Sequence, residues 1–181
     1  MAIVFVVTGV LLLLVAFMLI RTARLGQASE PVSKIEMPLV DSKEVSQHLS
    51  QMIQIQSISK EGVGQADPSP FREIHTWMEK TYPLLNDRLE KEVINTCSLL
   101  FRLQGSDTNL APVLFNAHMD VVPVDESTLS EWKVDPFSGT IREGYVWGRG
   151  AIDMKGQAVS LLESMEALLR EGYSPKRTIY L

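Results

Sequence analysis

The chain has 181 residues, of which 45% are hydrophobic and 22% are charged, a composition typical of a globular protein with one domain. Its 17 Lys and Arg residues against 22 Asp and Glu residues give a formal net charge of -5 at pH 7. A mildly acidic chain without a basic run argues against nucleic acid as the main partner. The single cysteine, Cys97, excludes an internal disulfide, and we interpret it as a small buried hydrophobic residue.

The first predicted element is a membrane helix. Residues 3–20 are apolar apart from Thr8 and Gly9, and they carry no charge. As a helix this stretch spans about 27 Å at roughly 1.5 Å per residue, which matches a hydrocarbon core of about 30 Å. We therefore predict a transmembrane anchor over residues 1–21.

A cleaved signal peptide is the alternative for the same segment, because small residues near Ala28 suit a cleavage site. The absence of Lys and Arg from the first ten residues and the length of the apolar run favour the anchor. Arg21 and Arg24 follow the helix, so the positive-inside rule favours a cytoplasmic domain, although two charges leave the orientation open. Cleavage would instead make the protein secreted.

Residues 22–40 contain several Gly, Ser and Pro residues and indicate an extended linker. The domain over residues 41–181 then begins with a helix capped by Asp41 or Ser42. Its apolar stripe is formed by Val45, Leu49, Met52 and Ile53. Residues 61–70 are predicted to be a loop. A second amphipathic helix follows, marked by Phe71, Ile74, Trp77 and Met78, and ends near residues 82–83.

The second half of the domain alternates strands and helices. Residues 93–103 are rich in apolar and β-branched side chains and predict one strand, and residues 113–115 begin another. Turns are expected at residues 105–109 and 135–139, and a short hairpin at residues 140–146. A helix over residues 158–170 precedes a strand that starts near Thr178. This alternation predicts an α/β layered domain.

A histidine and an aspartate follow the strand at residues 113–115. His118 and Asp120 are two positions apart, so their side chains project to the same side of an extended backbone. The carboxylate can then accept the proton of one imidazole nitrogen and leave the other nitrogen for a metal ion. Sites in open α/β sheets gather at the carboxyl ends of strands. Taken alone, however, such a histidine is more often structural.

Asp153 lies in a turn with glycines at positions 148, 150 and 156, directly before the predicted helix. The spacing of these glycines fits neither the dinucleotide-binding pattern nor the P-loop. A carboxylate held in such a turn can offer one oxygen to each of two metal ions. The plainer alternative is that Asp153 caps the helix.

Together these motifs resemble the zinc-dependent aminoacylase/carboxypeptidase family of metallohydrolases, which includes carboxypeptidase S-like enzymes and N-fatty-acyl-amino acid hydrolases. The resemblance rests on HMDVVP at 118–123, WKVDPFSG at 132–139 and GRGAIDMKG at 148–156, in this order. It extends over residues 41–181. The stretch LFRLQGSDTNLAPVLFNAHMD at 100–120 resembles the N-fatty-acyl-amino acid hydrolase branch in particular.

The resemblance implies a three-layer αβα zinc-exopeptidase-like catalytic domain that hydrolyses amide bonds in small peptides or N-acyl amino acids. It implies that His118 binds one of two zinc ions and that Asp120 is the active-site carboxylate that orients it. Asp153 would bridge both ions, and the Asp153–Met154 peptide would be cis. Full-length members also suggest a homodimer. His48 and His75 match no ligand of the family.

In the family, the general-base glutamate and the remaining ligands come after the strand that begins near Thr178. The chain is therefore expected to be a truncated, amino-terminal portion, inactive alone and weak in zinc binding, because each zinc needs about three protein ligands. A non-catalytic, membrane-tethered interaction protein is the main alternative. A metal phosphoesterase that uses the His-x-Asp pair is less favoured.

Overall fold

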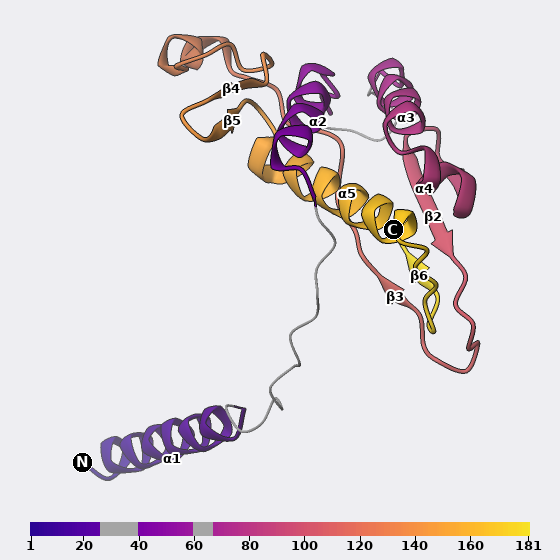
Figure 1. Cartoon of the computed structure of the whole chain (residues 1–181). Coiled ribbons are helices and arrows are strands. Elements are labelled where there is room, and N and C mark those ends of the chain that lie inside the picture. Colours follow the sequence, from indigo (N-terminus) through magenta and orange to yellow (C-terminus); the bar gives the residue numbers. More distant parts are fainter. Residues whose placement is uncertain (26–39, 60–66) are drawn as a thin grey trace. The chain divides into compact units, whose positions relative to one another are not determined.

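The computed structural model describes residues 1–25, 40–59 and 67–181, and Figure 1 shows the chain. It divides into two units, Met1–Met37 and Pro38–Leu181, which are described separately below. Most of the predicted linker falls on residues 26–39, which lie outside the described residues.

The first unit contains helix α1 (Ala2–Leu25), which extends beyond the predicted end at residue 21. Its stretch Val4–Arg24 has a mean hydropathy of 2.7, and none of it is buried. Within the described ranges it is the one helix long and apolar enough to cross a membrane, a property shared by signal sequences. The structure therefore contains the expected apolar helix.

The second unit is built on a mixed four-stranded sheet with the strand order β1-β2-β6-β3. Strands β1 (Glu90–Ile94) and β2 (Ser98–Leu103) form an antiparallel hairpin. Strand β6 (Ile179–Tyr180) pairs antiparallel with β2, whereas β3 (Val113–Leu114) runs parallel to β6. The predicted α/β class is confirmed, and β3 and β6 form where strands were expected.

The single strand predicted over residues 93–103 was wrong, because the chain reverses in its middle. Residues 95–97 form the turn between β1 and β2. Asn95 and Thr96 adopt φ values of 48° and 72°, a left-handed conformation that asparagine tolerates better than most residues. Apolar residues on both sides of the turn made the two strands look continuous in the sequence.

Four helices accompany the sheet: α2 (Ser42–Gln54), α3 (Ser69–Thr81), α4 (Pro83–Arg88) and α5 (Gly156–Arg170). Asp41 caps α2 as expected, because its carboxylate accepts a hydrogen bond from the Lys43 N–H at 2.8 Å. Helix α3 begins at Ser69, inside the predicted loop, since Pro70 is compatible with a first helical turn. Residues 61–66 of that loop lie outside the described residues. Helix α4 was not predicted.

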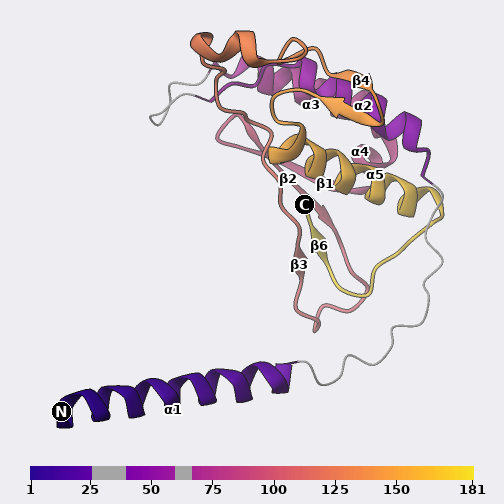
Figure 2. The same cartoon turned by 90° about the vertical axis from the view of Figure 1, so that its left-hand side faces the viewer.

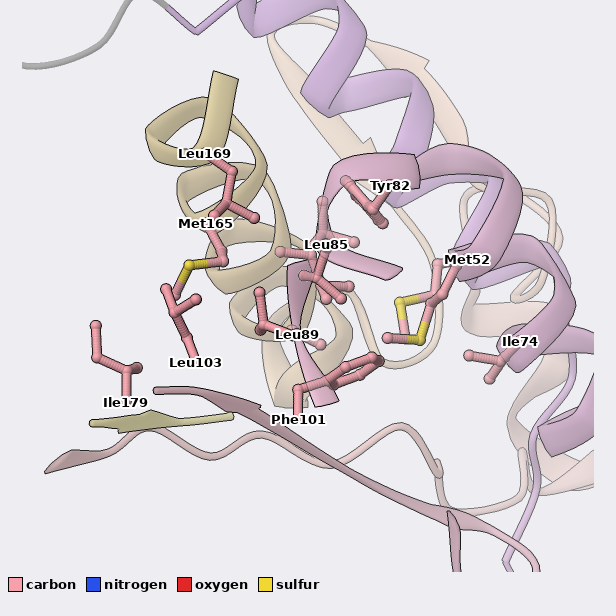
Figure 3. Close-up of a cluster of buried hydrophobic side chains, with 14 of the residues drawn as sticks. Met52, Ile74, Tyr82, Leu85, Leu89, Phe101, Leu103, Met165, Leu169 and Ile179 are labelled. Atoms are coloured by element: carbon pink, nitrogen blue, oxygen red, sulfur yellow. The ribbon is translucent and has the colours of Figure 1, made fainter. Parts of the chain in front are cut away.

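The four helices of this unit lie on one face of the sheet, as Figures 2 and 3 show. The core between helices and sheet includes Met52, Ile74, Tyr82, Leu85, Phe101, Leu103, Met165 and Ile179. Leu114 of β3 is 63% exposed. No described helix of the unit covers the opposite face of the sheet, so the described residues supply two of the three predicted layers.

A small second sheet packs against α2 and precedes the turn that carries Asp153. Strands β4 (Thr140–Arg142) and β5 (Tyr145–Trp147) form the predicted hairpin, after a short helix η1 (Glu126–Glu131) that was not predicted. A helical turn, η2 (Ala151–Lys155), follows β5 and leads directly into α5. Gly139 lies against α2, where a Cβ atom would come within 2.4 Å of the Ser50 carbonyl oxygen.

Candidate metal centre

The fold brings together the three residues that the motifs singled out. The His118 Nε2 atom lies 2.9 Å from Oδ1 of Asp153, although the two residues are 35 positions apart. The Nδ1 atom lies 3.0 Å from the Asp120 carbonyl oxygen and 3.1 Å from its carboxylate Oδ1. Asp120 therefore faces one imidazole nitrogen and Asp153 faces the other.

The two contacts determine the charge that the imidazole prefers. Burial lowers the pKa of His118, but hydrogen bonds to Asp120 and Asp153 and the negative charges of both carboxylates outweigh it and raise the pKa. Both partners accept hydrogen bonds, so the ring satisfies them best with a proton on each nitrogen. The site thus favours positive charge between the His118 Nε2 atom and the Asp153 carboxylate. A metal ion at that position would satisfy the same two groups.

Asp153 belongs to the turn η2, which connects β5 to α5. The peptide between Asp153 and Met154 is cis, as the resemblance implied. The Asp153 side chain is 86% exposed and that of His118 is 47% exposed. Both metal-competent atoms are therefore accessible from solvent.

Two glycines of this turn are required by close approach. Gly150 has a φ of 84°, and a Cβ atom there would lie 2.4 Å from Cγ1 of Val121. At Gly156 a Cβ atom would meet the Ala151 carbonyl oxygen at 2.4 Å. Gly150 thus allows the turn to pack tightly against Val121, and Gly156 allows α5 to begin close to the Ala151 carbonyl.

Sequence reasoning missed Lys155, which is fully buried two positions after Asp153. Its Nζ atom donates hydrogen bonds to the Met52 carbonyl at 2.9 Å and to the Ile55 carbonyl at 2.7 Å. Burial lowers the pKa of Lys155 to about 8, against the opposing effect of the Asp120 charge. A lysine in a glycine-rich turn normally suggests a solvated side chain, so the sequence carried no clear signal for this contact.

An apolar cavity of about 360 Å³ adjoins His118 and Asp120. Its lining includes Met52, Phe71, Phe101, Ala158 and Leu162 from helices α2, α3 and α5 and strand β2. Cys97 also lines it and is partly exposed, so the fully buried position that we expected is wrong. The Cys97 carbonyl lies 3.0 Å from Nε2 of His75, which gives that histidine an ordinary structural contact.

The donor set fits zinc in kind, because zinc accepts imidazole nitrogen and carboxylate oxygen. In the described residues, no three His, Cys, Asp or Glu side chains gather into a metal-binding group. The Asp120 carboxylate lies beside Nδ1, so it does not add a third donor beside Nε2. His118 and Asp153 together supply two donors, whereas a zinc ion takes about three from protein.

Comparison with known proteins agrees with this chemistry. Residues 114–181, which contain His118, Asp120 and Asp153, match the model of the peptidase family M20/M25/M40. The chain is therefore related to a family of hydrolases.

Relatives of the M20 family match larger parts of the chain. Carboxypeptidase S of Saccharomyces cerevisiae is 44% identical over 113 residues, which are 61% of this chain and 20% of the relative. The N-fatty-acyl-amino acid synthase/hydrolase of Xenopus tropicalis is 34% identical over 178 residues, 94% of this chain and 34% of the relative. The chain thus spans between 20% and 34% of the length of these relatives.

The fold is also similar to solved M20 structures. An M20 family metallo-carboxypeptidase from Sulfolobus solfataricus superposes with a TM-score of 0.57 at 26% identity. The match covers 78% of this chain and 30% of that protein. Human carnosine dipeptidase 1 gives a TM-score of 0.54 at 25% identity, covering 76% of this chain and 31% of that structure. The α/β unit therefore has the architecture of part of an M20 peptidase.

Proposed function

We propose that this chain contributes part of the zinc centre of a membrane-anchored amidohydrolase. His118 would hold one zinc ion, the Asp153 carboxylate would be shared by two, and Asp120 would orient the His118 imidazole. The observation that carries this proposal is the contact of 2.9 Å between His118 Nε2 and Asp153 Oδ1, with Asp120 on Nδ1. Such a carboxylate–imidazole pair fixes the tautomer and raises the basicity of the metal-binding nitrogen.

The proposed reaction is hydrolysis of an amide bond in a small peptide or an N-acyl amino acid. Bound zinc supplies Lewis acidity at the amide carbonyl and lowers the pKa of water. In this chain, Asp120 keeps a proton on the Nδ1 atom of His118 and so leaves the Nε2 atom free for zinc. The Asp153 carboxylate lies beside the same Nε2 atom. The relatives carboxypeptidase S and N-fatty-acyl-amino acid synthase/hydrolase support this substrate range by their names.

A chimera tests the assignment. Residues 41–181 replace the corresponding part of the Xenopus tropicalis N-fatty-acyl-amino acid synthase/hydrolase, whose match covers 94% of this chain. Hydrolysis of a dipeptide and of an N-acyl amino acid is measured with zinc and with a chelator. We expect zinc-dependent activity that His118→Ala and Asp153→Ala abolish and Asp120→Asn lowers. His75→Ala is the matched control. A soluble chimera that is inactive, or that keeps full activity without His118, would contradict the proposal.

We also propose that the 181-residue chain alone is inactive and binds zinc weakly, because two donors fall short of a zinc site. Purified chain is assayed with the same substrates, and zinc-dependent hydrolysis would contradict this. A second candidate, a non-catalytic protein tethered to a membrane, rests on the apolar helix α1. In that case the chimera would be inactive, although the chain would still bind membranes.

The remaining proposals concern the assembly. We propose that residues 1–21 anchor the protein, residues 22–40 link it, and residues 41–181 form part of a three-layer catalytic domain that dimerises in its complete form. The apolar stretch of α1 supports the anchor, with mean hydropathy 2.7 over Val4–Arg24. Resistance of the membrane-bound chain to alkaline carbonate and an intact N-terminus would support the anchor. A mature N-terminus near Ala28 would instead indicate a secreted protein.

A further inference from the structure

The five residues that follow helix α2, here called the exit segment (residues 55–59), run beside the loop that carries His118. Ser57 is fully buried, and its Oγ donates a hydrogen bond to the Met119 carbonyl at 2.5 Å. The Val121 N–H donates to the Ser57 carbonyl at 2.9 Å, and the Ser59 N–H donates to the Val121 carbonyl at 3.0 Å. Three hydrogen bonds therefore fix residues 119–121 to the exit segment.

The same segment holds the turn that carries Asp153. Lys155 donates to the Ile55 carbonyl at the start of the exit segment and to the Met52 carbonyl in the last turn of α2. Carbonyls at a helix C-terminus lack partners within the helix, and a cation near them is favourable. Lys155 therefore ties the turn η2 to the end of α2 through two charge-assisted hydrogen bonds.

The direct contact between the two metal-competent residues is less protected. His118 and Asp153 meet through side chains that are 47% and 86% exposed, whereas Ser57 and Lys155 are fully buried. Exposed charged pairs contribute little stability, because water competes with them. The distance between His118 and Asp153 must therefore be set mainly by the buried contacts of Ser57 and Lys155. The close approach of Gly150 to Val121 adds a further buried contact between the two segments.

We propose that the exit segment sets the distance between His118 and Asp153, and that Ser57 and Lys155 are positioning residues of the metal centre. Ser57 fixes the His118 loop and Lys155 fixes the Asp153 turn to the same short stretch of backbone. This inference rests on the proposed function only for its zinc readout. The geometry of the His118–Asp153 pair is the more direct readout, since it requires no metal.

The test uses the full chain in detergent micelles, with histidine labelled by ¹⁵N. Ser57→Ala and Lys155→Met each remove one tie. Glu166→Gln is the matched control, because Glu166 is also buried and accepts hydrogen bonds from two backbone N–H groups, those of Leu84 and Leu85. The ¹⁵N resonances of His118 are recorded with a chelator present, and zinc affinity is measured by competition with a chelating dye.

We expect both variants to shift the Nε2 resonance of His118 and to weaken zinc binding about 10–100-fold, the range found when residues that support metal ligands are replaced. Glu166→Gln should lower thermal stability but leave the resonance unchanged and zinc affinity within about twofold of the parent, because its hydrogen bonds go to the backbone of α4.

The proposal is overturned if the two variants and the control lose stability alike while the His118 resonances stay unchanged. If zinc binding by the parent chain is too weak to measure, the His118 resonances alone decide the positioning inference, and the chimera decides the metal role.

Discussion

The carboxylate of Glu166 holds the short helix α4 in place. Glu166 lies on α5 and is 4% exposed. Its two oxygens lie 3.1 Å from the Leu84 nitrogen and 2.9 Å from the Leu85 nitrogen. These N–H groups belong to the first turn of α4, where a helix offers no internal partners and an anion is favourable. We therefore predict that α4 depends on this one side chain.

Two substitutions separate the contribution of the Glu166 charge from that of its hydrogen bonds to α4. Glu166→Gln keeps one acceptor oxygen and loses one charge-assisted hydrogen bond, so the free energy of unfolding should fall by about 1.5–3 kcal/mol. Glu166→Ala leaves both buried donors unpaired and creates a cavity, and it should cost about 3–5 kcal/mol. The order of the two losses follows from the number of N–H groups left without a partner.

Urea unfolding of the full chain in micelles measures these losses, with the other two tryptophans replaced so that Trp77 alone reports. The Trp77 ring lies 5.7 Å from the ring of Tyr82, the residue that joins α3 to α4. Glu73→Gln on the exposed face of α3 is the control and should change stability by less than about 0.5 kcal/mol. A Glu166→Gln variant as stable as this control would refute the reasoning.

Three further predictions concern the turns, the caps and the site. Gly150→Ala should lower the free energy of unfolding in urea by at least about 1 kcal/mol more than Gly144→Ala, because both have positive φ but only Gly150 of the two lacks space for a Cβ atom; equal losses would contradict the close packing. Asp41→Ala should cost about 1 kcal/mol in urea unfolding, and an unchanged midpoint would argue against the cap. In metal-free chain, NMR titration of His118 should give a pKa above the ordinary value of about 6.5, and Asp153→Asn should lower it. Because the folded pKa is raised, the stability that His118 contributes is complete below its ordinary pKa and is lost as the pH rises through the folded pKa; a His118 pKa at or below the ordinary value would contradict this.

Much of the helical layer could be predicted because its side chains repeat with the helical period. The stripes of α2 and α3 and the helix α5 were all legible in that way, and Asp41 marked the start of α2. Turn chemistry was harder to read. The reversal at Asn95 and Thr96 was hidden because apolar residues continue on both sides, and α4 was missed because six residues are too few to show a period.

The candidate site divides in the same way. The family resemblance carried by the motifs implied that His118, Asp120 and Asp153 share a site, and the fold brings them into contact. The supporting contacts of Ser57 and Lys155 could not be predicted from the sequence. Each of these side chains donates a hydrogen bond to main-chain carbonyls. Every residue has such a carbonyl, so the residue types do not predict which ones will pair.

The sequence by itself determined the apolar N-terminal helix, the α/β class and the residues able to bind a metal, because these depend on side-chain chemistry and local periodicity. The tertiary structure decided how the His118 loop and the Asp153 turn are held beside each other. That arrangement depends on backbone carbonyls and N–H groups brought together from α2, the exit segment and η2. Such contacts form only when packing removes the competing water, and no local pattern encodes them.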